Sequence, residues 1–234
     1  MDSLKYEKSY IVKSSDVDST KKMRITGIMN VLQDLAVMGA EVLGFGKDKV
    51  LDKGYLWVFS KLEIKIFRLP DYLEEIELIT YPNQTMHFIY PRTFEFKDKD
   101  GNILIKATSL WCLIDKETRK LLSPKETGVN PISQIKVDKI SPINVFPTEL
   151  KETRRVRYSD LDINNHLNNI RYLEYILDLF DSNFICEKDI KKINMVFHQE
   201  IKENEMVYIN ASPNNSYFYF SINEDKKVFE CNIE

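Results

Sequence analysis

A short polar motif occurs twice in the chain, each time between a strand-like segment and a helix-like segment. The two copies are Ser15-Asp16-Val17-Asp18 and Ser159-Asp160-Leu161-Asp162. Each copy follows β-prone residues and precedes apolar residues spaced as on one face of a helix. Four matching residues alone could arise by chance, but the same order of elements around both indicates an internal repeat. The sequence therefore predicts two copies of one structural unit in tandem.

The residues around the first copy predict one long helix and an antiparallel sheet. A strand is expected over residues 5–14, and a helix of about five turns begins at Ile25 and ends at Gly44-Phe45-Gly46. Alternating apolar residues predict further strands over 54–67, 73–81, 86–97 and 103–115, with a hairpin turn at Lys99-Asp100-Gly101-Asn102. A single helix can bury its apolar stripe only against such a sheet, so we expect an α+β fold.

The residues around the second copy repeat this order. A strand is predicted over 152–158 and a helix from about Leu167 to Phe180, and the later strands are expected near 193–201, 205–212, 216–222 and 227–233, with turns at Asn214-Asn215 and Glu224-Asp225. Half of the eight prolines fall between residues 120 and 150, where no period survives. We therefore expect an N-terminal unit over 1–125, a linker over 126–150 and a C-terminal unit over 151–234.

Composition excludes several classes of function. The 234 residues carry a net charge of -3, so no overall basic field favours nucleic acid. Cys112, Cys186 and Cys231 lack metal-ligand spacing, so we expect no metal, no cofactor and no structural disulfide. No apolar run is long enough to span a membrane, and the N-terminus is too charged for a signal peptide. These features predict a cytoplasmic protein that does not act at a membrane.

The two copies differ after the shared motif. The second continues as Asp162-Ile163-Asn164-Asn165-His166-Leu167-Asn168-Asn169. When the two copies are aligned, His166 corresponds to Lys22 and Asn164 corresponds to Thr20. A histidine can move a proton near neutral pH, an asparagine can position a carbonyl or a water, and N–H groups at a helix start can stabilise an oxyanion. These are groups for acyl transfer or hydrolysis. The alternative is that the Asn and Asp residues only cap the helix.

The other histidines are weaker candidates. His87 lies in the strand predicted over 86–97, where packing explains it. If Phe197 faces the core, strand alternation places His198 and Glu200 together on the opposite face. Glu200 could equally be an ordinary surface acid.

The run from Ser159 to Tyr172 resembles the signature of the acyl-acyl-carrier-protein (acyl-ACP) thioesterases of plants and bacteria. Leu56-Trp57-Val58, Ala107-Thr108-Ser109-Leu110-Trp111 and Thr118-Arg119-Lys120-Leu121 are similar to segments in the first half of that family. The resemblance implies two tandem hotdog units, each a long helix wrapped by an antiparallel sheet. It also implies that the chain hydrolyses fatty acyl-ACP to free fatty acid, ending chain elongation.

By this resemblance, Asp162, Asn164, His166 and Glu200 match the catalytic residues of the family. Many plant members place a cysteine directly after the glutamate, but this chain has Ile201 there, so a Cys-His pair is not available. The implied reaction is hydrolysis in which Glu200 and His166 activate a water. Asp162 would either orient this network or attack as a carboxylate nucleophile.

The resemblance also implies an acyl tunnel in the first unit and a surface for the acidic acyl carrier protein. Candidate tunnel residues are Met29, Leu32, Ala36, Trp57, Phe59 and Phe88, although each could equally be ordinary core. Carrier-protein docking is expected at two basic clusters, one with Arg154, Arg155 and Arg157 next to Lys151, the other with Arg119 and Lys120 between Lys116 and Lys125. Because alternate strand residues share a face, Arg155 and Arg157 could point together; a solvated face is the alternative.

Three other functions remain open from sequence. The chain could hydrolyse acyl-coenzyme A esters with the same fold and chemistry. It could bind acyl thioesters without catalysis, although the presence of all four candidate catalytic residues argues against this. A hotdog hydratase or dehydratase is the third alternative. A homodimer is possible, although a tandem pair already contains two units.

Overall fold

The computed structural model describes residues 4–181, 189–223 and 226–234, and its chain divides into two units. Unit 1 comprises Met1–Val17 and Lys21–Ile140, and unit 2 comprises Asp18–Thr20 and Ser141–Glu234. The boundary at 140/141 lies inside the segment predicted as a linker, so the first part of that segment belongs with unit 1.

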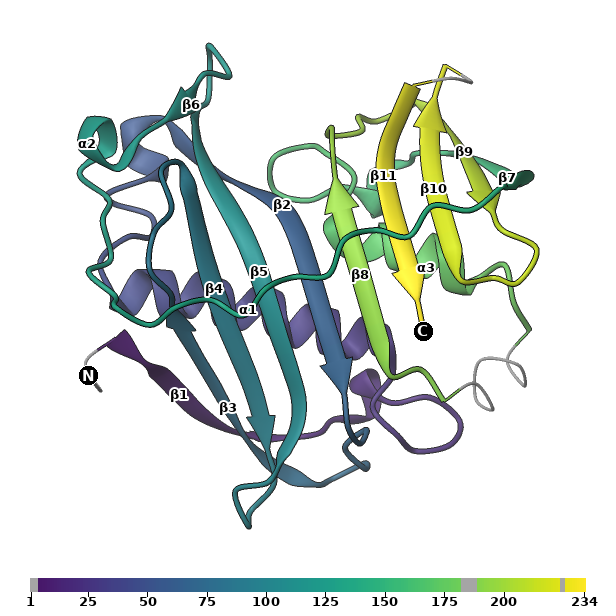
Figure 1. Ribbon diagram of the computed structural model, residues 1–234, viewed down its shortest axis with the longest axis horizontal. Helices are drawn as coiled ribbons and strands as arrows, with labels where there is room; N and C mark the ends of the chain where they lie inside the picture. Colours follow the sequence, from purple (N-terminus) through teal and green to yellow (C-terminus); the bar gives the residue numbers. More distant parts are fainter. Residues whose placement is uncertain (1–3, 182–188, 224–225) are drawn as a thin grey trace. The chain divides into compact units, whose positions relative to one another are not determined.

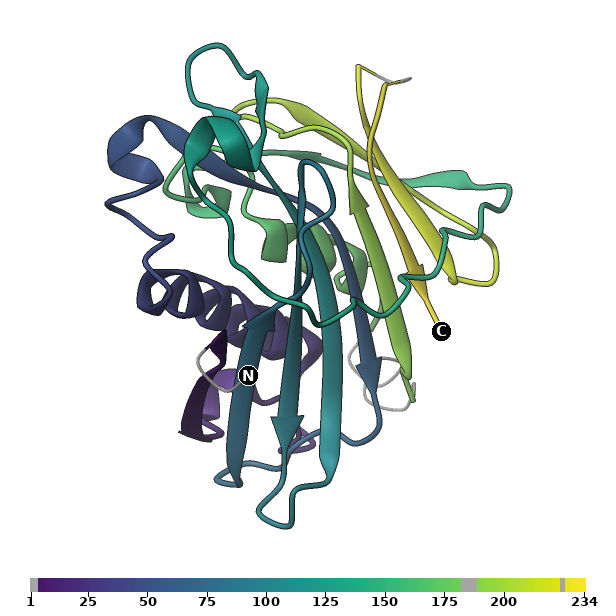
Figure 2. The same ribbon diagram turned by 60° about the vertical axis from the view of Figure 1, so that its left-hand side comes forward.

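Unit 1 is an antiparallel sheet of five main strands with one long helix on one face (Figures 1 and 2). The strand order is β1-β3-β4-β5-β2. The strands are β1 (Tyr6–Ile11), β2 (Tyr55–Ile66), β3 (Glu75–Pro82), β4 (Ile89–Lys97) and β5 (Ile103–Asp115), and the helix is α1 (Ile25–Val42). Two short 3-10 helices, η2 (Ser14–Asp16) and η3 (Leu51–Lys53), flank α1. The predicted order of elements is confirmed.

The apolar stripe of α1 explains where the core of unit 1 lies. Residues at helical spacing on this face are buried: Ile25, Ile28, Met29, Leu32, Leu35 and Ala36. The helix ends at Val42, Leu43 is its C-cap, and Gly44 follows with a φ of 71°. The predicted hairpin also forms, because Asp98 Oδ1 accepts the N–H groups of Asp100 (3.0 Å) and Asn102 (2.9 Å).

The proline-rich stretch between residues 120 and 150, where the sequence showed no period, contains regular structure at its start. Strand β6 (Leu121–Leu122) pairs with β5, and a four-residue helix, α2 (Pro124–Thr127), follows it. Ser123 caps α2 through a reciprocal capping box with Glu126. So short a helix shows no apolar period, which is why sequence periodicity missed it.

Unit 2 repeats the arrangement of one helix and one antiparallel sheet, with the strand order β8-β11-β10-β9-β7. The strands are β7 (Glu149–Arg155), β8 (Lys192–Phe197), β9 (Met206–Ala211), β10 (Tyr217–Ile222) and β11 (Lys226–Ile233); the helix is α3 (Asn169–Leu177), preceded by the 3-10 helix η4 (Tyr158–Asp160). β7 lies three residues earlier than predicted, and α3 is shorter. The predicted turn at Glu224-Asp225 lies outside the described residues.

An aromatic cluster forms the core of unit 2. The ring centroids of Tyr172 on α3 and Phe229 on β11 lie 4.8 Å apart, and Phe220 and Phe197 lie 5.1 and 5.0 Å from Phe229. These rings fix α3 against the sheet. The catalytic loop predicted from sequence leads directly into this helix.

Equivalent backbone hydrogen bonds hold the loop before the helix in each of the two units. In each unit, the residue directly before the helix donates its N–H to the carbonyl of the second residue of the repeated motif. The residue two positions before the helix donates its N–H to a carbonyl in a loop that joins two strands. The matched bonds are Arg24 to Asp16 (2.8 Å) with Asn168 to Asp160 (2.9 Å), and Met23 to Pro70 (2.8 Å) with Leu167 to Ile201 (2.7 Å). The internal repeat is therefore a repeat of backbone geometry.

Candidate active site

Asp162 organises the loop of unit 2 that carries the candidate catalytic residues. Its Oδ1 accepts the backbone N–H groups of Asn164 (2.8 Å) and His166 (3.1 Å), and its own N–H donates to the His166 carbonyl (2.8 Å). Asn165 adopts a φ of 61°, which asparagine tolerates better than most residues. The carboxylate thus holds the loop in one conformation and fixes the backbone position of His166.

The backbone brings His166 and Glu200 together from distant parts of the sequence. Leu167 donates to the Ile201 carbonyl at 2.7 Å, and His166 forms an isolated β-bridge with Lys202. His166 Nε2 consequently lies 3.5 Å from Glu200 Oε2, and the two side chains are 17% and 31% exposed. This distance is longer than an ordinary hydrogen bond, but such contacts commonly shorten when substrate binds.

Asn164 lies at the exposed tip of the same loop. Its side-chain amide has no hydrogen-bond partner in the described part of the chain, although its backbone is held by Asp162. The amide can therefore both donate to and accept from a bound ligand. The structure brings all four residues predicted as catalytic onto one loop and the segment hydrogen-bonded to it.

The start of α3 offers fewer free N–H groups than the sequence suggested. Asn168 is the N-cap: its Oδ1 accepts from Ile170 at 3.1 Å, and its carbonyl accepts from Arg171 at 2.8 Å. Those two donors are already used, so they do not form the expected oxyanion site. The alternative of helix capping is thus correct for Asn168.

Tyr172 belongs to this site and was not singled out from the sequence. Its side chain is 2% exposed, and burial raises the pKa of its hydroxyl well above the ordinary value, with further contributions from the negative charges of Glu200 and Asp162. The hydroxyl therefore stays neutral at physiological pH. Tyr172 ends the recognised motif, but nothing in a sequence distinguishes it from a tyrosine that only packs.

The other two histidines do not join the site. β8 ends at Phe197, so strand alternation does not extend to Glu200; His198 Nε2 instead contacts Glu230 Oε2 at 2.8 Å. His87 is exposed in the turn before β4 with a φ of 52°, so the prediction that it packs within a strand was wrong.

Neither described cysteine is placed as a nucleophile. Cys231 is fully buried and Cys112 is partly buried, and burial raises the pKa of both thiols. Cys186 lies outside the described residues. Within the described ranges, no three His, Cys, Asp or Glu side chains cluster as metal ligands do, and no helix there is long and apolar enough to cross a membrane.

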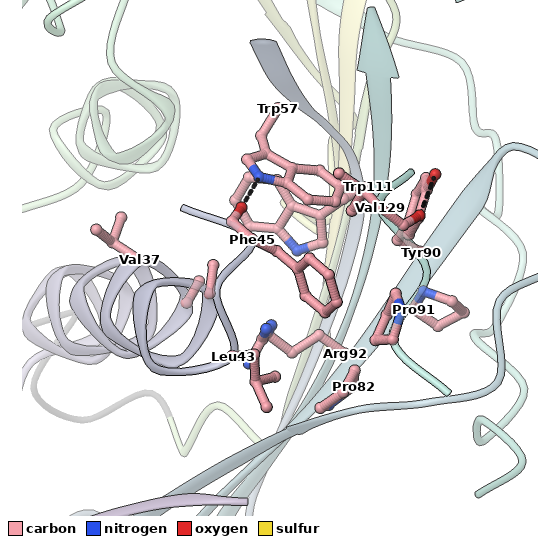
Figure 3. Close-up of a pocket in the computed structure, with 13 residues that line it drawn as sticks. Val37, Leu43, Phe45, Trp57, Pro82, Tyr90, Pro91, Arg92, Trp111 and Val129 are labelled. Atoms are coloured by element: carbon pink, nitrogen blue, oxygen red, sulfur yellow. Dashed lines mark hydrogen bonds between the residues drawn. The ribbon is translucent and has the colours of Figure 1, made fainter. Parts of the chain in front are cut away.

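Unit 1 contains an apolar pocket with about 600 Å³ of empty space, including its open side (Figure 3). Of the residues predicted to line a tunnel, Ala36 and Trp57 line it. Met29 and Leu32 are core residues, Phe59 stacks on Trp111 with 4.6 Å between ring centroids, and Phe88 is 40% exposed before β4. Sequence spacing identified the helix face, but it could not locate the pocket, whose walls come from the end of α1, four strands and the segment after α2.

The predicted docking arginines differ from one another. Arg154 bonds Glu152 (2.6 Å) and Asp178 (2.8 Å) and lies over the Tyr175 ring, so it serves the packing of unit 2. Arg155 and Arg157 are exposed, but β7 ends at Arg155, so the argument that the two share a strand face was wrong.

In the second predicted docking cluster, Lys120 pairs with Glu126 at 3.4 Å. Arg119 lies in the preceding turn with a φ of 59°. Both side chains are exposed.

Comparisons with known proteins agree with the geometry. The family models of the acyl-ACP thioesterase N-terminal and C-terminal domains match residues 3–131 and 147–233. The chain is 26% identical over 220 residues to oleoyl-acyl carrier protein thioesterase 1 of Arabidopsis thaliana, covering 83% of this chain and 60% of that protein. It is 24% identical over 195 residues to palmitoyl-acyl carrier protein thioesterase of Cuphea hookeriana, covering 76% and 47%. The chain thus spans about half the length of such relatives.

Solved structures give the same result. An acyl-ACP thioesterase from Bacteroides thetaiotaomicron superimposes with a TM-score of 0.84 at 25% identity, covering 98% of this chain and 96% of the other. The 12:0-ACP thioesterase from Umbellularia californica superimposes with a TM-score of 0.84 at 19% identity, covering 100% and 98%, which supports the shared fold. The fold is therefore the tandem hotdog that the motif implied, and the chain belongs to the acyl-ACP thioesterase family.

Proposed function

We propose that this chain hydrolyses the thioester of fatty acyl-ACP, releasing free fatty acid and ending chain elongation. The observation that carries the proposal is the contact between His166 Nε2 and Glu200 Oε2, next to a loop that Asp162 holds in place. A carboxylate beside an imidazole orients the ring and stabilises the imidazolium that forms when the ring takes a proton in the reaction. Membership of the family supports the substrate class.

In the proposed reaction His166, assisted by Glu200, takes a proton from a water that attacks the thioester carbonyl carbon. The tetrahedral intermediate then expels the thiolate, the C–S bond breaks, and the proton passes from His166 to the sulfur. The products are a fatty acid and the carrier protein with a free thiol. The exposed amide of Asn164 orients the attacking water or the carbonyl oxygen.

Asp162 acts in this scheme as an orienting residue. One of its oxygens already accepts two backbone N–H groups, and these bonds fix the orientation of the carboxylate within the loop. Direct attack by Asp162 is the alternative, and the two routes differ in what an amide at this position can support. Neither route needs a thiol nucleophile, consistent with Ile201 after Glu200.

The acyl chain is proposed to occupy the apolar pocket of unit 1, and the exposed Arg155 and Arg157 are proposed to meet the acidic carrier protein. Acidic partners are attracted to such side chains over distances comparable with the screening length. Arg154 is left out of this proposal because its guanidinium already has two acidic partners.

The test is release of free thiol from matched acyl-ACP and acyl-coenzyme A substrates, from butyryl to stearoyl, with the wild type and His166→Ala. Turnover of acyl-ACP that depends on His166 and peaks at one chain length supports the proposal. Strong turnover of coenzyme A esters with weak turnover of acyl-ACP reassigns the substrate. Thioester binding without turnover of any substrate contradicts catalysis.

A further inference from the structure

The pocket of unit 1 contains one cation among apolar walls. Arg92 on β4 reaches toward the last turns of α1 (Figure 3). The other lining residues are aliphatic, aromatic or proline: Ala36, Val37, Ala40, Leu43, Phe45, Trp57, Pro82, Tyr90, Pro91, Trp111, Val129 and Pro131. A ligand that matches these walls must be largely apolar, and the guanidinium adds a single requirement for a hydrogen-bond acceptor.

The guanidinium of Arg92 has no acidic partner in the described part of the chain. Its one hydrogen bond goes from Nη1 to Thr80 Oγ1 at 3.2 Å. Enclosure by protein lowers its pKa to about 10, with no compensating carboxylate, so the group is still charged at neutral pH. The side chain is only partly exposed to water, and an anion in the pocket would supply the partner that this cation lacks.

Helix α1 leaves room for this cation. A Cβ added to Gly39 would lie 2.6 Å from Arg92 Nη1 and 3.0 Å from Thr80 Cγ2. Glycine is disfavoured inside a helix, so its presence here fits the approach of the guanidinium. The nearby carbonyls of Gly39 and Ala40 accept the N–H groups of Leu43 and Phe45 and carry no charge that could neutralise Arg92.

We propose that this pocket binds a free long-chain carboxylate, with the carboxylate against Arg92 and the alkyl tail along the apolar walls. A guanidinium pairs with a carboxylate through two parallel hydrogen bonds, which no uncharged head group reproduces. The inference rests on the proposed function only in identifying this ligand as the reaction product. Because the substrate acyl chain is assigned to the same pocket, the released acid competes with substrate.

The test is calorimetric titration of the wild-type chain with decanoate and with 1-decanol, both below their aggregation limits. We expect decanoate to bind about tenfold or more tightly than the alcohol, which equals about 1.4 kcal/mol. Arg92→Met abolishes this preference, whereas Arg92→Lys keeps part of it. Lys99→Met removes one positive charge from the exposed hairpin of unit 1 and leaves the preference unchanged.

Equal binding of the two ligands to the wild type overturns the inference, whether or not the Arg92 variants fold. A preference that survives in folded Arg92→Met, checked by thermal unfolding, also overturns it. No titration requires turnover. Decanoate binding that depends on Arg92 in a protein without thioesterase activity would therefore refute the proposed function and leave this inference intact.

Discussion

Lys22 and His166 occupy the same position in the two repeats, yet each faces a different partner. Lys22 Nζ pairs with Asp71 Oδ1 at 2.8 Å on the surface of unit 1, whereas His166 Nε2 faces Glu200 Oε2 at 3.5 Å in unit 2. The loop bonds around both are alike, as Met23 to Pro70 and Leu167 to Ile201 show. One backbone frame thus carries a surface ion pair in one copy and an imidazole–carboxylate pair in the other.

Replacing His166 by alanine tests this difference directly. We expect kcat for acyl-ACP to fall about 10²- to 10⁴-fold, because the general base is lost while the loop bonds of Asp162 to the backbone remain. Lys22→Ala is the matched control, since it changes the equivalent residue of unit 1 and should leave kcat within about twofold of the wild type. Similar losses in both variants, measured by thiol release, would contradict the assignment.

Glu200→Gln keeps the shape of the side chain and removes its charge. Because the carboxylate stabilises the protonated imidazole, we expect a fall of about 10- to 100-fold in kcat with little change in KM. Glu203→Gln alters an exposed acid on the same connection and serves as the control. A loss expressed only in KM would show that Glu200 binds substrate and does not assist His166.

Much of the fold could be predicted from sequence because its signals are local. The stripe of α1 and the alternation of β2 and β5 are long periods, and their bounds lie within two residues of the predicted ones. The turn at Asp98 also depends only on neighbouring residues. The loop with Asp162 and His166 could be predicted for the same reason, because these two residues are only four positions apart in the sequence.

What could not be predicted depends on contacts between distant segments. His198 was expected to share a face with Glu200, but β8 ends one residue before His198, and sequence period does not reveal where a strand stops. The pocket was located only in part, because its walls include Pro131, from a segment with no period at all. Nothing in the sequence indicates that Arg92 lines an apolar pocket without a carboxylate partner.

Two replacements of Asp162 separate orientation from direct attack. The side-chain oxygen of an asparagine at this position can still accept both N–H bonds, so the free energy of unfolding of Asp162→Asn should lie within about 1 kcal/mol of the wild type. Asp162→Ala loses both bonds, and its free energy of unfolding should fall by about 1–3 kcal/mol. If Asp162 only orients, Asp162→Asn retains measurable turnover, above that of His166→Ala. A folded Asp162→Asn protein as inactive as His166→Ala would favour a nucleophilic carboxylate. Chemical denaturation and thiol release give the two readouts.

The neighbouring arginines Arg154 and Arg155 should respond oppositely to alanine. Burial alone would lower the pKa of Arg154, but its hydrogen bonds to Glu152 and Asp178 raise it overall, so both acids lose a partner in Arg154→Ala. We expect this variant to lose about 1–2 kcal/mol of stability.

Arg155→Ala should leave stability within about 0.5 kcal/mol and raise KM for acyl-ACP more at low salt than at high salt. An unchanged KM at low salt would remove Arg155 from the docking surface. An Arg154→Ala protein as stable as the wild type would show that the Arg154 contacts contribute nothing to the packing of unit 2.

Truncating Phe229 should destabilise unit 2 more than any surface change. Its ring lies 4.8 to 5.1 Å from those of Tyr172, Phe197 and Phe220, and its side chain is fully buried. We expect Phe229→Ala to cost about 3–5 kcal/mol, because it leaves a cavity beneath α3, and Phe229→Leu to cost less. Since Tyr172 contacts the Phe229 ring, kcat should also fall at urea concentrations below those that unfold the protein. Urea unfolding monitored by far-ultraviolet circular dichroism measures the change in the free energy of unfolding. A loss below about 1 kcal/mol would show that α3 is held mainly by other contacts.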